Sequence, residues 1–352
     1  MNMNNIEHLF QNPLFYFLFL RMAIYFQHNH FQSNPGCCDI PSPGHLPFPP
    51  DMTFEQPLIR PPSEWRSGLI RVTRGCNWNR CRFCGIYPHL GEPSFSVRPL
   101  PDILADVALL QQRRPDIETM FLGDADPLQA GVATITELTG HLRQSFSLTR
   151  ITCYARASTL KKLGRDGVMQ LADAGLNRIH LGLESGSDEV LRYHRKGQSA
   201  DMVREVAVWL RDASIELSVY VLLGLGGSSL WRQHALATAE LLNAIEPAFI
   251  RVRRLWVYPE SPYGPGSPLL GEIAAGKFQP QSPEGTVLEL QLLLQQLTAR
   301  GAEFTCDHEN NYIKVKGQLP RDRPAMLAQI EAFLARPARE REQHYREVGS
   351  RI

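Results

Sequence analysis

Cysteine is scarce in this chain, and neither sign of charge dominates it. The 352 residues include 7 cysteines, and 37 Lys+Arg stand against 36 Asp+Glu, which gives a formal net charge of +1. Cysteines at this frequency exclude a secreted disulfide scaffold. The balanced charge argues against a dedicated surface for nucleic acid or anionic membrane. With 43% hydrophobic and 21% charged residues, the composition predicts a globular protein with room for one barrel-sized domain plus appendages, or for two smaller domains.

Long hydrophobic runs are also missing. The best candidate, residues 14–26, is thirteen residues long and contains Arg21, whereas crossing a bilayer takes about 20 apolar residues. The segment lacks the basic leading region and the small-residue cleavage site of a secretory signal. We therefore predict a cytoplasmic protein with no membrane span.

The first 62 residues differ from the rest of the chain. Residues 1–34 hold six of the 16 phenylalanines, and nine prolines follow between Pro35 and Pro62. Such a proline-rich run cannot form a helix or a central strand, so we predict a disordered leader and linker over residues 1–62. Two interpretations of the leader remain open: read-through from upstream of a true start at Met52, or a helix that binds a membrane surface or a partner.

From residue 67 onward, short β-type runs alternate with helical patterns, which is typical of βα units around a parallel sheet. The predicted strands are residues 69–73, 119–122, 150–154, 178–183, 216–223 and 249–257. The predicted helices between them are residues 101–112, 132–142, 165–174, 188–193 with 200–212, and 230–242. Six such units predict an α/β fold, a partial (β/α)6 TIM-like barrel, over residues 63–262. An open doubly wound sheet is the alternative, because periodicity does not distinguish a closed sheet from an open one.

Residues 263–352 predict a small, mainly helical C-terminal extension. Four prolines and two glycines between residues 259 and 268 end the barrel pattern in a loop. Beyond this loop, the pattern predicts helices over residues 283–299 and 323–334 and one β-like run at residues 312–315.

Three of the cysteines form a cluster, Cys76-x4-Cys81-x2-Cys84, directly after the first predicted strand. Three thiolates on one loop can hold three irons of a [4Fe-4S] cluster and leave the fourth iron open to a small molecule. They can equally supply three ligands of a structural zinc, with His89 as the fourth. The cysteines alone do not decide between these two sites.

Polar or glycine-rich segments follow three further predicted strands. They are residues 123–126 (GDAD), residues 184–186 (ESG) and residues 224–227 (GLGG). Because cofactor chemistry in βα barrels lies at the carboxyl ends of the strands, these segments and the cysteine loop are expected on one face. A structural zinc needs no acids or glycine loops at neighbouring strand ends, whereas an open cluster iron with a nucleoside-like ligand does. The combination favours the iron–sulfur interpretation.

In these motifs the chain resembles the radical S-adenosylmethionine (SAM) superfamily over residues 60–262. The resemblance rests on the cysteine loop with Phe83 before its last cysteine, on the GGE-like segment at residues 123–126, on the run GLNRIHLGLESGSDEVLRYHRKG at residues 175–197, and on the glycine loop. The run at residues 175–197 is similar to that of oxygen-independent coproporphyrinogen oxidase-like and tRNA-modifying members. Two departures are an extra residue between Cys76 and Cys81, and a displaced acid in the GGE-like segment.

The resemblance implies a [4Fe-4S] cluster and SAM as cofactors. Cys76, Cys81 and Cys84 would hold the cluster, and SAM would chelate its open iron through the amino and carboxylate groups. The implied SAM contacts are Gly123, Asp124 and Asp126 for the amino group, Glu184 for the ribose hydroxyls, Lys196 for the carboxylate, and Phe83, Gly224 and Gly226 for the adenine.

The resemblance also implies a reductive mechanism. An electron from the cluster splits the sulfur–C5′ bond of SAM, and the 5′-deoxyadenosyl radical takes a hydrogen atom from the substrate. We therefore expect a radical SAM oxidoreductase or transferase that acts on a small molecule and is reduced by a partner such as flavodoxin or ferredoxin, with no nucleic-acid partner. The alternative function is a non-catalytic zinc-binding module of the Cys3His type on a βα scaffold.

Three arginines on the last predicted strand are a further candidate for binding. Alternation along the strand sends Arg251 and Arg253 to one side and Arg254 to the other. They can bind a carboxylate or phosphate of the substrate, or they can simply face solvent near the end of the strand.

Overall fold

The computed structural model describes residues 54–55, 59–91, 94–260, 262 and 264–349. Most of the predicted leader and linker therefore lies outside the described residues. Phe54–Ile352 form one compact unit. No helix in the described ranges is long and apolar enough to cross a membrane.

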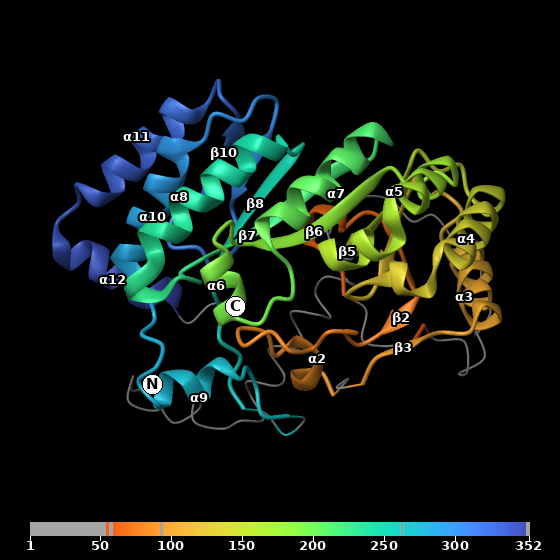
Figure 1. Cartoon of the computed structure of the whole chain (residues 1–352), viewed down its shortest axis with the longest axis horizontal. Coiled ribbons are helices and arrows are strands. Elements are labelled where there is room, and N and C mark those ends of the chain that lie inside the picture. Colours follow the sequence, from red (N-terminus) through yellow and green to blue (C-terminus); the bar gives the residue numbers. More distant parts are fainter. Residues whose placement is uncertain (1–53, 56–58, 92–93, 261, 263, 350–352) are drawn as a thin grey trace, which may run out of the picture. The chain divides into compact units, whose positions relative to one another are not determined.

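One eight-stranded sheet runs through this unit (Figure 1). In spatial order its strands are β1 (Gly68–Arg71), β4 (Thr119–Gly123), β5 (Arg150–Ala155), β6 (Arg178–Glu184), β7 (Glu216–Leu223), β8 (Phe249–Arg254), β9 (Glu303–Cys306) and β10 (Val315–Gln318). Neighbouring strands from β1 to β9 are parallel, and β10 is antiparallel to β9. Within the described residues β1 and β10 do not pair, so the sheet is open.

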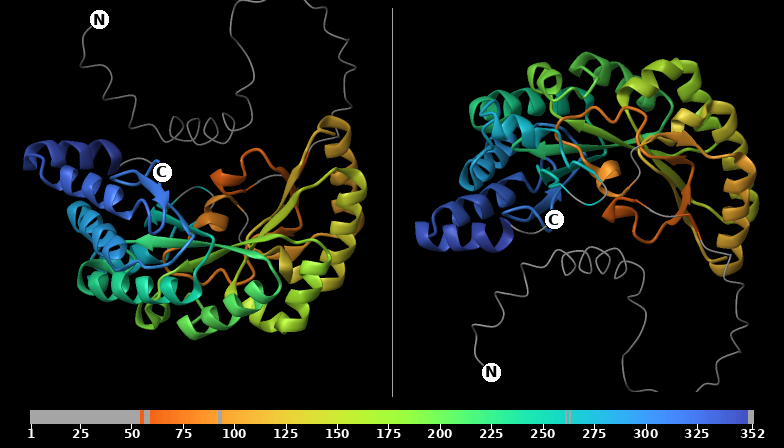
Figure 2. Two further views of the ribbon diagram at one scale, coloured as in Figure 1. Left: turned by 90° about the horizontal axis from the view of Figure 1, so that it is seen from above. Right: turned by 90° about the horizontal axis from the view of Figure 1, so that it is seen from below.

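Strands β4 and β7 are mostly apolar, as expected for strands covered on both faces, whereas β8 (FIRVRR) carries three arginines. In β4, for example, the sequence TMFLG is buried from Met120 to Gly123. The helices that connect these strands lie along the outer side of the curved sheet, and the segment between β1 and α3 lies on its inner side (Figure 2). The connecting helices are α3 (Leu100–Arg113), α4 (Val132–Ser145), α5 (Ala157–Asp173), α6 (Asp188–Tyr193), α7 (Ala200–Asp212) and α8 (Gly227–Ile245).

Local sequence explains where α7 begins. The Ser199 side chain accepts a hydrogen bond from the backbone N–H of Met202 at the start of α7, and this kind of cap satisfies an otherwise unpaired donor. The buried residues of α7, Val203, Val206 and Leu210, recur at helical spacing and pack into the main core.

The prediction of an α/β fold with six parallel βα strands is confirmed, because the predicted strands correspond to β1 and β4–β8. The chain after β8 adds more sheet than the pattern predicts. Its helices are α9 (Leu269–Ala274), α10 (Pro283–Gln296), α11 (Arg323–Leu334) and α12 (Ala338–Gly349). Strand β9 was not predicted, since four residues carry little periodicity and its pairing with β8 is a tertiary contact. The domain boundaries at residues 62 and 262 stay predictions.

The described end of the predicted linker makes specific contacts. Phe54 packs against the main core. Glu55 forms ion pairs with Arg71, Arg74 and Arg98 at 2.9, 2.6 and 3.2 Å. The short helix η3 (Pro62–Glu64) then leads into β1.

Candidate active site

The cysteine loop connects β2 (Thr73–Arg74) to the short helix α2 (Ile86–His89), on the inner side of the sheet. Its four-residue spacer contains Asn79, whose φ of 42° lies in the left-handed region, where Asn is tolerated better than most residues. The Asn79 N–H donates to the Sγ of Cys76 at 3.5 Å. The longer spacing is therefore accommodated by a turn in the loop.

The loop is held against the segment that follows α6. The Arg82 N–H donates to the carbonyl of His194 at 2.9 Å, and the Trp78 indole N–H donates to the carbonyl of Arg195 at 2.7 Å. Gly197 has a φ of 72°, and a Cβ there would lie 2.5 Å from the Trp78 ring. A glycine is thus required for this approach, which brings residue 196 to the cysteines.

A cavity of about 270 Å³ lies between the cysteine loop and the inner side of the sheet. Most of its lining comes from the cysteine loop with α2 and from the strands β5 to β8 and their following loops, and Ala125 after β4 and Asn310 after β9 also contribute. The sequence-predicted site residues that line it are Cys76, Cys81, Cys84, Phe83, Glu184 and Lys196. The structure therefore brings together the proposed cluster ligands and part of the proposed SAM site.

Glu184 and Lys196 form an ion pair inside this cavity. Glu184 Oε1 lies 2.8 Å from Lys196 Nζ, and the side chains are only 11% and 9% exposed. Burial alone would lower the pKa of Lys196, but the charges of Glu184 and Cys81 outweigh it and raise that pKa. A Cβ at Gly182 would lie 2.4 Å from Glu184 Oε1, so the glycine leaves the space that the pair occupies.

The position of Glu184 is not explained by helix capping. Ser187 caps α6, because its side chain accepts a hydrogen bond from the Val190 N–H at 3.4 Å. Glu184 ends β6 with a φ of 64°, where the register between β6 and β7 shifts. Its carboxylate is therefore turned toward the cavity and Lys196.

The donor set fits an iron–sulfur cluster better than a Cys3His zinc site. The three cysteines line one cavity, whereas His89 is not among the lining residues and packs on the ring of Tyr258 at 5.5 Å. Among the described residues, no three His, Cys, Asp or Glu side chains are arranged closely enough to hold a metal ion. Burial raises the pKa of Cys84 to about 12, so metal binding must displace the thiol proton.

The two predicted aspartates are buried and do not line the cavity. Asp124 is 1% exposed, and its Oδ2 accepts from Arg71 Nε at 2.8 Å. Asp126 is fully buried, its Oδ2 accepts from Thr159 and Gln129, and burial raises its pKa to about 6. Neither aspartate lines the cavity, but Ala125 between them does. Gly123 is also absent from the lining.

The glycine loop at residues 224–227 is covered as well. The Gly224 N–H donates to Glu289 Oε1 of α10 at 3.0 Å. A Cβ at Gly227 would lie 2.7 Å from the carbonyl of Gln279, so the chain before α10 packs directly on the loop. Neither Gly224 nor Gly226 lines the cavity.

Several lining residues were not singled out as cofactor or substrate contacts from the sequence. Arg156 donates to the carbonyl of Lys196 at 2.8 Å and lies 4.6 Å from the centre of the Trp78 ring. Tyr154, His180 and Tyr220 form an aromatic wall, with ring centres 6.0 to 6.4 Å apart. Large polar side chains at inward positions of buried strands are the signal that could have identified this wall.

The family comparison agrees with the motifs. Residues 70–239 match the radical SAM superfamily, so the chain contains a radical SAM domain. Proteins of this superfamily are enzymes that use a [4Fe-4S] cluster and SAM, which confirms the predicted cofactors at the level of the family.

Individual relatives are distant. A heme chaperone (HemW) of Buchnera aphidicola is 20% identical over 187 residues, which cover 52% of this chain and 49% of the relative. The chain thus matches about half the length of that curated relative.

Two solved structures of other proteins are similar to part of this chain. Coproporphyrinogen III oxidase from Escherichia coli has a TM-score of 0.48 and 17% identity, over 65% of this chain and 52% of that chain. Methylornithine synthase has a TM-score of 0.47 and 16% identity, over 80% of this chain and 85% of that chain.

Proposed function

We propose that this chain cleaves SAM reductively in the cavity under the cysteine loop and abstracts a hydrogen atom from a small-molecule substrate. The observation that carries the proposal is the shared cavity: three cysteines and the buried Glu184–Lys196 pair line the same space. A structural zinc site would not require that charged pair beside it.

When bound, the cluster and SAM supply one-electron cleavage of the sulfur–C5′ bond, giving methionine and a radical that removes hydrogen from the substrate. The residues of the chain bind and orient. Glu184 can accept hydrogen bonds from vicinal ribose hydroxyls, and Lys196 can pair with the carboxylate of SAM. Phe83, which lies 5.9 Å from Lys196 Nζ, offers an apolar surface for the adenine.

The segment at residues 123–126 contributes through its backbone in this proposal. Its two carboxylates are bound to Arg71 and to Thr159, and Ala125 is the residue of the segment that reaches the cavity. We therefore assign contact with the SAM amino group to the main chain around Ala125 rather than to Asp124 or Asp126. The glycine loop, which α10 and its preceding segment cover, is left without a direct role.

Anaerobic purification followed by metal analysis tests the proposal. We expect brown protein with about four irons and four sulfides per chain, and formation of 5′-deoxyadenosine and methionine after reduction with dithionite. Colourless protein that contains one zinc per chain and leaves SAM intact would instead establish the zinc-module alternative.

The class of reaction and the electron donor are part of the same proposal. We expect an oxidoreductase or transferase reduced by a flavodoxin or ferredoxin. Reduced flavodoxin or ferredoxin should sustain 5′-deoxyadenosine formation in place of dithionite. If 5′-deoxyadenosine formed only with dithionite, neither protein would be the electron donor.

A further inference from the structure

The wall of the cavity formed by β8 carries a cationic group that the cofactors do not account for. Arg253 lines the cavity together with Asn310. No carboxylate of the described residues lies within ion-pair distance of Arg253, whereas Lys196, another basic side chain of the lining, is paired with Glu184.

Arg253 is held in place by a chain of neutral groups. Its Nη2 donates to His308 Nε2, and His308 Nδ1 therefore donates to Asn310 Oδ1 at 2.7 Å. Burial, followed by the charge of Arg253, lowers the pKa of His308 to about 4, so the imidazole is uncharged near neutral pH and does not compensate the charge of Arg253. The Asn310 side chain in turn donates to the backbone carbonyl of Arg254 at 2.9 Å. The guanidinium is oriented but keeps its charge uncompensated.

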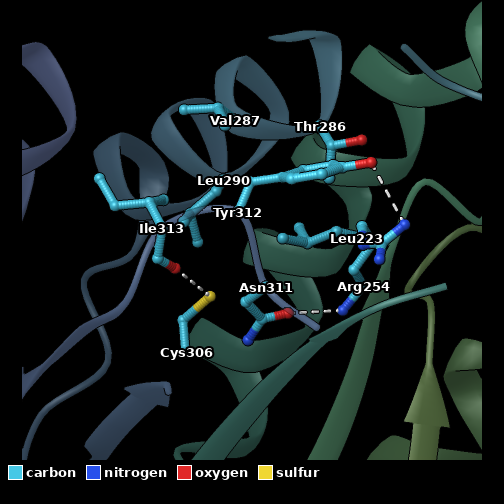
Figure 3. Close-up of a pocket in the computed structure, with 9 residues that line it drawn as sticks. All are labelled: Leu223, Arg254, Thr286, Val287, Leu290, Cys306, Asn311, Tyr312 and Ile313. Carbon is cyan, nitrogen blue, oxygen red and sulfur yellow. Dashed lines mark hydrogen bonds between the residues drawn. The ribbon is translucent and has the colours of Figure 1, made fainter. Parts of the chain in front are cut away.

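Arg254, the next residue, shows the contrast. Its guanidinium turns into the C-terminal layer, where it donates to the Tyr312 hydroxyl at 3.2 Å (Figure 3). It also donates to the Asn310 carbonyl at 2.7 Å. The small pocket that it lines there, with Leu223 and Leu290 among its walls, holds only about 10 Å³, which is too little for a ligand. Arg254 therefore supports the fold, and Arg253 remains available for binding.

The charges around the cavity favour an anionic ligand at this position. Besides the cysteines, the basic residues of the lining are Arg156, Lys196, Arg253 and Arg254, and Glu184 is the one acid among the described lining residues. Arg254 contributes to the lining although its guanidinium is bound to Asn310 and Tyr312. A single oriented guanidinium matches a carboxylate in a two-bond arrangement. The aromatic wall of Tyr154, His180 and Tyr220 beside it suits an apolar body.

We propose that Arg253 binds a carboxylate of the substrate, whose apolar or aromatic body packs on Tyr154, His180 and Tyr220. The proposal rests on the proposed function, because it places the substrate in the same cavity as the cofactors. It adds a substrate class, a carboxylic acid with an apolar body, and names Arg253 as a specificity-determining residue.

Equilibrium dialysis of the full-length, anaerobically reconstituted protein against benzoate, benzamide and phenyl phosphate tests this assignment. Wild-type protein should bind benzoate more tightly than neutral benzamide, by about ten- to a hundredfold, the range for loss of a charge-assisted hydrogen bond. Arg253→Gln should weaken benzoate binding by about the same factor and leave benzamide binding unchanged. The benzoate affinity of Arg253→Lys should lie between those of the wild type and Arg253→Gln, because lysine keeps the charge and loses the planar guanidinium.

Arg251→Gln is the matched control, since Arg251 lies on the same strand but binds Ser218 and does not line the cavity. The proposal would be overturned if wild-type protein bound no benzoate, or bound benzoate only as tightly as benzamide. It would also be overturned if Arg253→Gln left benzoate binding unchanged. Tighter binding of phenyl phosphate than of benzoate would also overturn it, in favour of a phosphate ligand. If Arg253→Gln does not fold, the comparison of benzoate with benzamide in the wild type and in Arg253→Lys decides.

A SAM titration separates this proposal from the function on which it rests. Arg253→Gln should keep its SAM affinity and its reductive cleavage of SAM. A fall in SAM affinity matching the fall in benzoate affinity would assign Arg253 to the SAM carboxylate and overturn the substrate assignment. A wild-type protein without cluster or SAM cleavage would remove the proposed function, while the dialysis would still report on Arg253.

Discussion

The ends of β6 and β7 offer similar sequence signals but have opposite surroundings. After β6, Glu184 faces the cavity and pairs with Lys196. After β7, Gly224 binds the buried Glu289, which comes from α10, and lies outside the cavity lining. A strand's carboxyl end places a segment at the correct edge of the sheet, but the element that packs on it decides whether a ligand can reach it.

The two glutamates also differ in charge state. The Glu184–Lys196 pair is an ion pair at a cavity. Glu289 Oε1 lies 3.3 Å from His234 Nε2, but burial raises the pKa of Glu289 to about 8 and lowers the pKa of His234 to about 4. Near neutral pH both groups are therefore uncharged, and their contact is a neutral one. The first region is built for binding charged groups and the second for packing.

The largest effect is expected from the cysteines that face the cavity. Changing Cys76, Cys81 or Cys84 to Ala should abolish cluster binding, because the remaining two thiolates do not hold a [4Fe-4S] cluster stably. Iron and sulfide analysis of anaerobically reconstituted protein measures this. His89→Ala is the control and should keep its full iron content. A cysteine variant that keeps its iron and sulfide would show that this cysteine is not a ligand.

The second prediction concerns the packed region. Below a pH of about 4.5 Glu289 is protonated in both the folded and the unfolded chain. As the pH rises, the unfolded chain loses this proton first, so burial of Glu289 costs stability increasingly until the folded pKa of about 8 is reached. The slope is roughly 1.4 kcal/mol per pH unit, which amounts to a few kcal/mol over this window.

Glu289→Gln should remove that slope, because an amide does not titrate. The amide carbonyl can still accept the hydrogen bond from the Gly224 N–H, so the packing is kept. Denaturant unfolding at pH 5, 6.5 and 8 should show a variant that gains stability over wild type as the pH rises. The contribution of His234 to the pH dependence is common to both proteins and cancels in the difference. Parallel curves for the two proteins would contradict a buried, neutral Glu289.

The sequence patterns predicted the site where its parts are local. The cysteines share one loop, and Glu184 and Lys196 belong to one run around α6, so neighbouring residues already specify them. The cover over the glycine loop was missed because Glu289 is 65 residues from Gly224. Nothing in the amphipathic pattern of α10 distinguishes a glutamate that turns inward. Strand β9 was missed for the same reason, since its pairing with β8 joins distant segments.

The third prediction tests the binding region directly. Glu184→Ala should keep the cluster but weaken SAM binding by about 1.5 to 3 kcal/mol, or roughly ten- to a hundredfold, because hydrogen bonds to a charged acceptor are lost. Titration of SAM into the anaerobically reconstituted variant measures the affinity. Formation of 5′-deoxyadenosine should also fall at subsaturating SAM. Glu289→Gln is the matched control, because Glu289 of α10 binds the neighbouring strand end at Gly224 outside the cavity lining, and it should bind SAM like wild type. Equal affinity in Glu184→Ala and wild type would rule out the ribose contact.

The smallest effect is expected at Asp126, which the sequence assigned to the SAM amino group and the structure places outside the cavity lining. Its Oδ2 accepts from Thr159 and Gln129, and the side-chain carbonyl of Asn can accept the same two bonds. Asp126→Asn should therefore change SAM affinity by less than about twofold, whereas loss of a carboxylate that binds an ammonium directly would cost about tenfold or more. Ala125→Val, at the residue that does line the cavity, should in contrast reduce SAM affinity by narrowing the space beside the backbone. The same SAM titration compares the two variants. A large loss of SAM affinity in Asp126→Asn with none in Ala125→Val would assign the amino-group contact to the Asp126 carboxylate. Asp126 would then be a ligand-binding residue like Glu184 rather than a packing residue like Glu289.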